Sequence, residues 1–256
     1  MNPIAVGGAS FLCVFGSALL GMFCAAKLPE DHLSSNSKET IRVVMTFLAT
    51  LSALVIGLLL NSAKSSFDAN DEEVKAIAAD ITELDKLMAE YGPETTQARN
   101  LFSSAVAARI NEVWPSEATA IDMDAVRRDA DDEPLRRQIL ALSPSNDTQS
   151  LLKSSALNVA ADLAKSGSIL VADTQGTIQW PFLAIQVFGL SLLFVSFGLF
   201  APRNAVVIAA LFVSALVLAG SIYLIVAMDQ PYRGLIKISS EPLRSALAGL
   251  GCCAVA

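Results

Sequence analysis

Four long, uninterrupted apolar stretches are the feature that most restricts the fold of this 256-residue chain. A helix needs about 20 apolar residues, each rising about 1.5 Å, to cross a hydrocarbon core that is about 30 Å thick. Four stretches reach this length, and Arg42 is the only charged residue in any of them: 4–26, 41–60, 180–200 and 205–228. Hydrocarbon offers a backbone N–H or C=O group no partner, so only helices and closed barrels cross it, and these runs are too continuous for barrel strands. The sequence therefore predicts an all-α integral membrane protein with four transmembrane helices.

The composition supports a membrane protein and argues against several other classes. Hydrophobic residues make up 53% of the chain and charged residues only 17%, and the mean hydropathy is +0.52. The net charge of −7 disfavours nucleic-acid binding, because phosphate contacts need a basic surface. One histidine and four cysteines are too few for multi-histidine metal sites or zinc-finger arrays, and no phosphate-binding or dinucleotide-binding glycine loop is present. We therefore expect no metal, no cofactor and no enzymatic activity.

The loops between the apolar stretches predict how the helices pair. Fourteen residues join the first two stretches and four join the last two, so residues 1–61 and 179–228 are expected to form two antiparallel transmembrane hairpins. Between them lies a soluble insert, residues 62–178, and after them a short tail, residues 229–256. Five lysines and arginines lie near span ends on the side of the insert and tail, and four on the opposite side. This small excess predicts that the termini, the insert and the tail are cytoplasmic.

The insert carries the pattern of several helices. Five apolar residues follow spacings of 3, 4, 3 and 4, which predicts a helix that continues outward from the second span and ends at Gly92: Val74, Ile77, Ile81, Leu84 and Met88. Further helices are predicted over residues 95–114, over residues 123–142 with Pro134 as a potential break, and from Asp147, as N-cap, to Gly167. The insert holds 11 basic and 20 acidic residues, a net charge of −9. We therefore expect an acidic, helical, cytoplasmic domain.

Two acidic runs in the insert contain carboxylates of the kind that bind calcium. Residues 68–73 resemble the opening of a calcium loop, but the sixth position is Glu73 rather than glycine, and the twelfth is Ala79 rather than a carboxylate. This run is interpreted as a solvated turn at the N-terminal end of a helix, where carboxylates are favourable. Residues 129–133 cluster carboxylates without an intervening lysine, which suits either a cation site or a solvated turn, and the turn is the preferred interpretation.

The second apolar stretch has one continuous face of small or polar residues. The members of this face follow spacings of 4, 3, 4 and 4: Thr46, Thr50, Ala53, Gly57 and Asn61. Small residues usually let membrane helices approach closely, and this use is preferred, but the same face could line a narrow aqueous path that Phe47 gates as a hydrophobic constriction. The spans lack the charged residues that pumps and coupled transporters place at membrane depth, which disfavours active transport.

The last two apolar stretches and the tail carry a family resemblance. It rests on Trp180-Pro181, on residues 197–204 and above all on residues 228–244, whose most specific motif combines Asp229, Pro231, Tyr232 and Gly234. These segments resemble the bacterial bestrophin-like membrane proteins. The resemblance implies a homo-oligomeric anion or cation channel in the bacterial inner membrane, pentameric in the manner of bestrophin channels, with four spans per subunit and a helical cytoplasmic body. No stretch matches the bestrophin pore neck or calcium clasp, so no pore or calcium residue is transferred.

Two functional hypotheses follow. The first is an oligomeric passive ion channel in which the second span lines the path for small inorganic ions, and the −9 insert favours cations at the cytoplasmic mouth. The second is a non-conducting membrane scaffold or sensor whose cytoplasmic helices bind a partner protein through the stripe of residues 74–88. In both, Asp229 ends the last span, Pro231 and Gly234 turn the chain, and Ser240 starts a short amphipathic docking helix.

Overall fold

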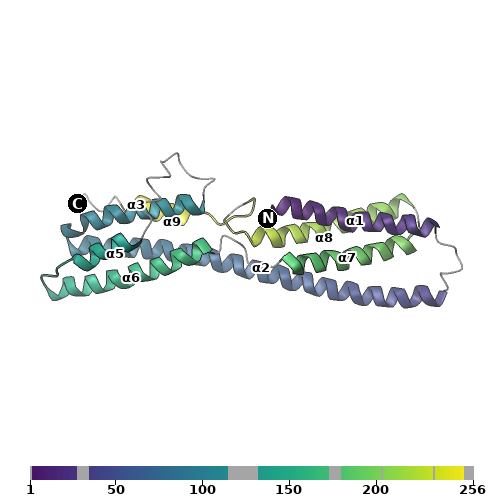
Figure 1. Cartoon of the computed structure of the whole chain (residues 1–256), viewed down its shortest axis with the longest axis horizontal. Coiled ribbons are helices and arrows are strands. Elements are labelled where there is room, and N and C mark those ends of the chain that lie inside the picture. The colour runs from purple at the N-terminus through teal and green to yellow at the C-terminus, as the bar shows by residue number, and fades with distance from the viewer. Residues whose placement is uncertain are drawn as a thin grey trace. The chain divides into compact units, whose positions relative to one another are not determined.

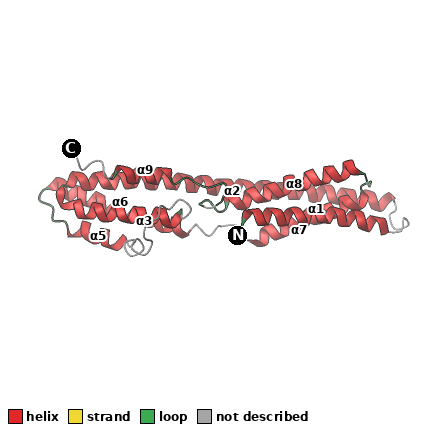
Figure 2. Cartoon of the chain, turned by 90° about the horizontal axis from the view of Figure 1, so that it is seen from above, coloured by secondary structure: helices red, strands yellow, loops and turns green. Residues whose placement is uncertain are grey.

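The computed structural model describes residues 2–27, 35–114, 132–172, 180–202, 204–232 and 234–250. Within these ranges every regular element is a helix (Figure 2). The elements are α1 (Pro3–Lys27), α2 (Ser35–Tyr91), the 3-10 turn η2 (Pro93–Thr95), α3 (Thr96–Val113), α5 (Asp132–Ala141), α6 (Asp147–Ala172), α7 (Trp180–Phe200), α8 (Ala205–Met228) and α9 (Glu241–Gly249). The helices α1, α2, α7 and α8 are long and apolar enough to cross a membrane. The prediction of a helical chain with four such helices is confirmed.

The chain divides into two compact units. Unit 1 comprises residues 1–66 and 177–230, and unit 2 comprises residues 67–176 and 231–256. The 57-residue helix α2 contributes its first part to unit 1 and its second part to unit 2. Each unit has an apolar core of its own, and each is described separately below.

Unit 1 is assembled from the four apolar helices. Helix α1 packs along both α7 and α8 (Figure 1). Its approach to α7 is close, because a Cβ atom added to Gly21 would collide with the backbone of Val195, and one added to Gly198 would collide with the carbonyl oxygen of Ala18. Such close backbone contact at small residues is the usual way that helices associate in membranes.

Unit 2 buries the apolar stripe of residues 74–88 against α3, α5, α6 and α9. All five predicted stripe residues are buried in its core, from fully buried Val74 and Leu84 to 6% exposed Ile77. The helix ends where predicted, because Gly92 adopts φ +133°, a left-handed value that favours glycine, and Pro93 follows. The buried hydroxyl of Thr95 lies 2.5 Å from the Met88 carbonyl oxygen and 2.8 Å from that of Gly92, and it donates to them at this corner.

The remaining insert helices largely follow their predicted ranges. Helix α3 confirms the prediction over residues 95–114, and α6 starts at the predicted residue but extends five residues past Gly167. The predicted N-cap is wrong by one residue, because Asn146 Oδ1 accepts the Gln149 N–H at 2.7 Å. Pro134 does not break α5, because it lies in the first turn, where no intrahelical donor is required. Residues 123–131 of the predicted third helix lie outside the described residues.

The first acidic run does not begin a helix. Residues 68–73 lie in the interior of α2, so the expected N-terminal turn is wrong, and the reason is that the helix of the second span continues without interruption. Asp71 instead pairs with Lys75 one turn later, at 2.6 Å. Of the second run, Asp132 and Glu133 begin α5, and residues 129–131 lie outside the described residues.

Candidate functional site

Helix α2 is the most exposed apolar helix of unit 1. We compare an 18-residue apolar segment in each of these helices. In α2 only 6% of this segment is buried inside the subunit, against 28% in α1, 33% in α7 and 17% in α8. Its inward side includes Met45, Leu48, Ile56 and the buried Ser52, whose carbonyl oxygen accepts a hydrogen bond from Gln186 Nε2 of α7 at 3.2 Å. The rest of its circumference faces outward.

All five residues of the predicted small or polar face are exposed in the single subunit, and so is Phe47 beside it: Thr46, Thr50, Ala53, Gly57 and Asn61. The Thr46 hydroxyl donates to the Arg42 carbonyl oxygen and the Thr50 hydroxyl to the Thr46 carbonyl oxygen, both at 2.9 Å. Both hydroxyl hydrogens are therefore satisfied within the helix, and their oxygens remain able to accept. A Cβ atom added to Gly57 would meet no described atom within 4 Å. Close helix packing inside the subunit therefore does not use the face at Gly57.

The exposed surface of α2 has a second, different side. Four large apolar residues are exposed there: Val44, Leu51, Val55 and Leu58. Residues three or four apart share a helix face, so this side is rotated from the face that holds Thr50 and Gly57. The outer surface of α2 is thus mostly apolar, with Val43 and Leu54 exposed beside the small or polar face, and only a narrow strip of it offers hydroxyl, amide and backbone groups.

The tail motif folds into a loop that docks on α3. The Asp229 N–H donates to the Ile225 carbonyl oxygen at 3.1 Å and caps α8, and the Ile238 N–H closes the following loop on the Pro231 carbonyl oxygen at 2.7 Å. Gly234 has φ +100°, which explains a glycine at this turn. Helix α9 then begins at Glu241 as predicted.

This loop packs against Trp114, a contact that no sequence pattern predicted. Its ring is fully buried and meets the ring of buried Tyr232 edge-on, with centroids 5.3 Å apart. Its Nε1–H donates to the Ile238 carbonyl oxygen at 2.9 Å. The available signal was composition: only two tryptophans occur in the chain, and this one ends a helix immediately before a proline. The structure therefore makes the tail motif a docking element.

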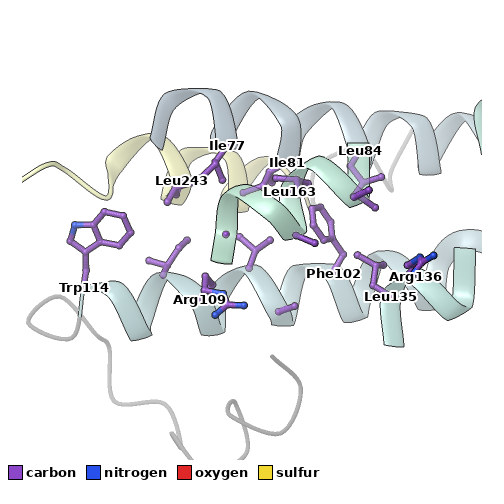
Figure 3. A pocket seen from close by; sticks show the side chains of 17 residues that line it. Ile77, Ile81, Leu84, Phe102, Arg109, Trp114, Leu135, Arg136, Leu163 and Leu243 are labelled. Carbon is purple, nitrogen blue, oxygen red and sulfur yellow. The ribbon is translucent and has the colours of Figure 1, made fainter. Parts of the chain in front are cut away.

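A largely apolar pocket of about 230 Å³ lies inside unit 2 (Figure 3). Its walls include Ile81 of α2, Phe102 of α3 and Leu163 of α6, and Arg109 and Arg136 are its charged lining residues. Arg109 Nη1 pairs with Glu112 at 3.1 Å, and Arg136 is exposed. No local pattern in the sequence indicates this pocket, because small residues on a helix do not reveal which side chains they face.

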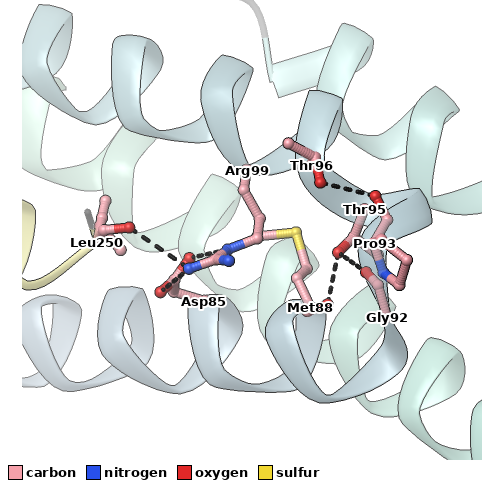
Figure 4. A network of polar contacts seen from close by, with 8 residues as sticks. All are labelled: Asp85, Met88, Gly92, Pro93, Thr95, Thr96, Arg99 and Leu250. Atoms are coloured by element: carbon pink, nitrogen blue, oxygen red, sulfur yellow. Dashed lines mark hydrogen bonds and ion pairs between the residues drawn. The ribbon is translucent and has the colours of Figure 1, made fainter. Parts of the chain in front are cut away.

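A bidentate ion pair joins α2 to α3 in the same unit (Figure 4). Arg99 Nε and Nη2 donate to the two carboxylate oxygens of Asp85 at 2.6 and 2.9 Å, and Nη2 also lies 3.4 Å from the Leu250 carbonyl oxygen. The side chain of Asp85 is 6% exposed and that of Arg99 17%. Paired carboxylate and guanidinium groups in this geometry serve to fix helix register.

The acidic groups of unit 2 are not gathered into a metal site in the described part of the chain, where no three histidine, cysteine or acidic side chains converge. Burial raises the pKa of Asp80 above its ordinary value, and the negative charges of Glu83 and Asp162 raise it further. This environment therefore disfavours the ionised form of Asp80.

Comparison with known proteins gives one clear result. No curated protein matches the chain. The family model described as Bestrophin-like domain matches residues 12–243, a range that includes α2, α3, α5 to α8 and most of α1. That match covers far more than half of the chain, so the protein belongs to the bestrophin-like family.

Proposed function

We propose that this protein is the subunit of a homo-oligomeric, passive ion channel in the bacterial inner membrane, with the small or polar face of α2 lining the path. The observation that carries the proposal is the exposure of that face in a single subunit. The free acceptor oxygens of Thr46 and Thr50 and the amide of Asn61 suit a polar neighbour better than lipid, and in a closed ring this neighbour would be the axial path.

The two exposed sides of α2 suit such a ring. The side with Leu51 and Leu58 would face lipid or an adjacent subunit, while Thr46, Thr50 and Asn61 would face the axis. Phe47, 65% exposed beside Thr46, would narrow the path, since a ring of aromatic side chains excludes water. No enzymatic step is needed for this function.

The proposal includes a topology and a preference among ions. Residues 1–61 and 179–228 would form the two transmembrane hairpins, and the insert 62–178 and the tail 229–256 would lie in the cytoplasm with the N-terminus. The insert carries 20 acidic against 11 basic residues. Its field would raise the local concentration of cations at the cytoplasmic mouth, so small inorganic cations are the expected permeant ions.

The alternative function as a scaffold required an exposed surface for partner binding, and that surface is buried. This alternative assigned partner binding to the stripe of residues 74–88, and the structure buries all five stripe residues in the core of unit 2. Partner binding through this stripe would require unit 2 to open. We therefore do not propose it as a second function.

The particle mass is the first test. We expect light scattering of the detergent-solubilised protein, corrected for bound detergent, to give one species near five subunits of 27.0 kDa each. That species, reconstituted into liposomes, should dissipate a potassium gradient faster than empty vesicles. A strictly monomeric particle, or vesicles that pass no ion above background in several salts, would refute the channel.

Cysteine accessibility then tests the role of α2. In a background without the cysteines at 13, 24, 252 and 253, Thr50→Cys should react with a membrane-impermeant cationic thiol reagent and lose flux. Leu58→Cys lies two turns further on the same helix and is the matched control, because its exposed side chain belongs to the apolar side. If both cysteines react equally, or if neither reacts in vesicles that conduct ions, then α2 does not line the path.

A further inference from the structure

The pocket of unit 2 owes its existence to small residues on α6. Ala160, Ala164 and Gly167 follow spacings of 4 and 3, so they lie on one helix face, and all three line the pocket. Core-facing positions of a helix normally carry large side chains that fill the space between helices. Large side chains of α2 and α3, including Ile81 and Phe102, also line the pocket (Figure 3).

The charges on the pocket wall have one sign. Arg109 and Arg136 come from α3 and α5, and no acidic residue of the described chain is among those that line the pocket. This is unusual for an insert with a net charge of −9. An apolar wall with a few placed polar groups is the usual composition of a site for a small molecule, in which the polar groups orient the ligand. Arg109 also pairs with Glu112 at 3.1 Å, but a guanidinium group has five N–H donors, so both arginines could still donate to an anion at this wall.

We propose that this pocket binds the anion of a medium-chain fatty acid. Its acyl chain would occupy the space between Ile81, Phe102 and Ala164, and its carboxylate would accept hydrogen bonds from the guanidinium groups at the wall. An apolar cavity of about 150 Å³ admits benzene with its six carbon atoms, so in proportion a pocket of about 230 Å³ has room for an acyl chain of about nine carbon atoms. Decanoate therefore has a suitable length. This site is separate from the proposed ion path and does not depend on it.

Trp114 supplies the reporter, because it lines the pocket and is fully buried. The second tryptophan, Trp180, begins α7 and is 67% exposed, so Trp180→Phe leaves Trp114 as the single emitter. We expect 10-bromodecanoate to quench Trp114 saturably in the full-length protein, embedded in discs of uncharged phosphatidylcholine. The uncharged 10-bromodecanol has the same chain and tests the contribution of the head group.

The variants separate the apolar site from its charges. Ala164→Phe should fill the pocket and abolish saturable quenching, whereas Asn158→Leu on an exposed position of the same helix should change nothing. Arg109→Gln with Arg136→Gln should weaken decanoate binding by at least about tenfold, the effect of a lost charge-assisted hydrogen bond, and leave decanol binding within about twofold.

Two results would overturn the proposal. Quenching that Ala164→Phe leaves intact would place the bromine outside the pocket. If 10-bromodecanoate and 10-bromodecanol bind with equal affinity, and the arginine double variant does not change either affinity, the pocket does not select an anion. The arginine variant leaves the apolar core unaltered, so this second outcome can be measured even if Ala164→Phe does not fold.

Discussion

The two parts of α2 place the same backbone in opposite chemical environments. In unit 1 most of the outward residues are large and apolar, with Leu54 60% and Leu58 62% exposed, while a serine, Ser52, is buried. In unit 2 the outward residues are charged, as at Lys75 and Glu83, and the buried stripe is apolar. One continuous helix therefore reverses its polarity pattern along its length. This reversal is what a helix needs if one part lies in lipid and the other in water.

The interactions that stabilise each unit internally differ accordingly. Water drives large apolar side chains such as Leu84, Met88 and Trp114 into the core of unit 2, and this burial is the main favourable term in its folding. Lipid gives no such drive, because its tails are as apolar as leucine. Unit 1 instead relies on close backbone approach at Gly21 and Gly198 and on a few polar contacts such as that of Gln186. The comparison predicts that the two units respond to different kinds of substitution.

The largest expected effect comes from adding a single methyl group at the crossing of α1 and α7. Gly198→Ala would place a Cβ atom against the backbone carbonyl of Ala18, and only separation of the helices relieves that collision. We expect a loss of about 3 kcal/mol or more, the upper range for overpacking. Denaturation in mixed micelles of mild detergent and SDS measures it, together with the recovery of monodisperse protein.

Gly189→Ala on the same helix is the matched control. A Cβ atom there would meet no described atom within 4 Å, so we expect unchanged or slightly increased stability, by up to about 0.5 kcal/mol, because alanine is the better helix former. Equal stability losses for the two variants would mean that helix propensity rather than close packing governs α7, and would contradict the account of unit 1.

The second effect tests unit 2 through its bidentate ion pair. Asp85→Ala removes the carboxylate and leaves the Arg99 guanidinium, 17% exposed, without its strongest acceptor. Removal of one partner of a buried pair typically costs about 3 kcal/mol. We expect a reduced melting temperature for unit 2, measured by the near-ultraviolet circular dichroism signal of Trp114. Asp71→Ala, which breaks the exposed pair with Lys75 on the same helix, should leave the melting temperature unchanged. A large loss at position 71 would indicate that exposed charge pairs hold α2.

Much of this fold could be predicted because its signals are local in sequence. The length of an apolar run and the 3 and 4 spacing of Val74 to Met88 are readable without knowledge of neighbours, and Gly92 with Pro93 ends the helix through its own backbone. The cap of α6 was missed by one residue because Asn146 and Asp147 both suit the role, and only the hydrogen bond to Gln149 decides between them.

The candidate sites were less predictable because they depend on register between distant helices. Asp85 and Arg99 are 14 residues apart, and Trp114 and Ile238 are 124 apart, so neither contact follows from any local spacing. The face of Thr46, Thr50 and Gly57 could be recognised in the sequence, but not that the subunit leaves it uncovered. The pocket depends on small residues of α6 meeting large ones of α2 and α3.

The smallest effect concerns charge in unit 2 and is resolved by pH. The pKa of half-buried Asp80 is raised, first by burial and then by Glu83 and Asp162, so the native state binds this proton more tightly than the unfolded chain does. Its stabilising contribution is therefore present below the unfolded value of 3.8 and is lost as pH rises through the higher native value. Asp80→Asn should melt at a slightly higher temperature than the wild type at pH 7, and the difference should shrink as pH falls toward 4. Asp162→Asn should reproduce part of this change, since it removes one repulsive charge. A difference that stays constant with pH would show that packing of the amide, rather than the charge of Asp80, sets the stability at this position.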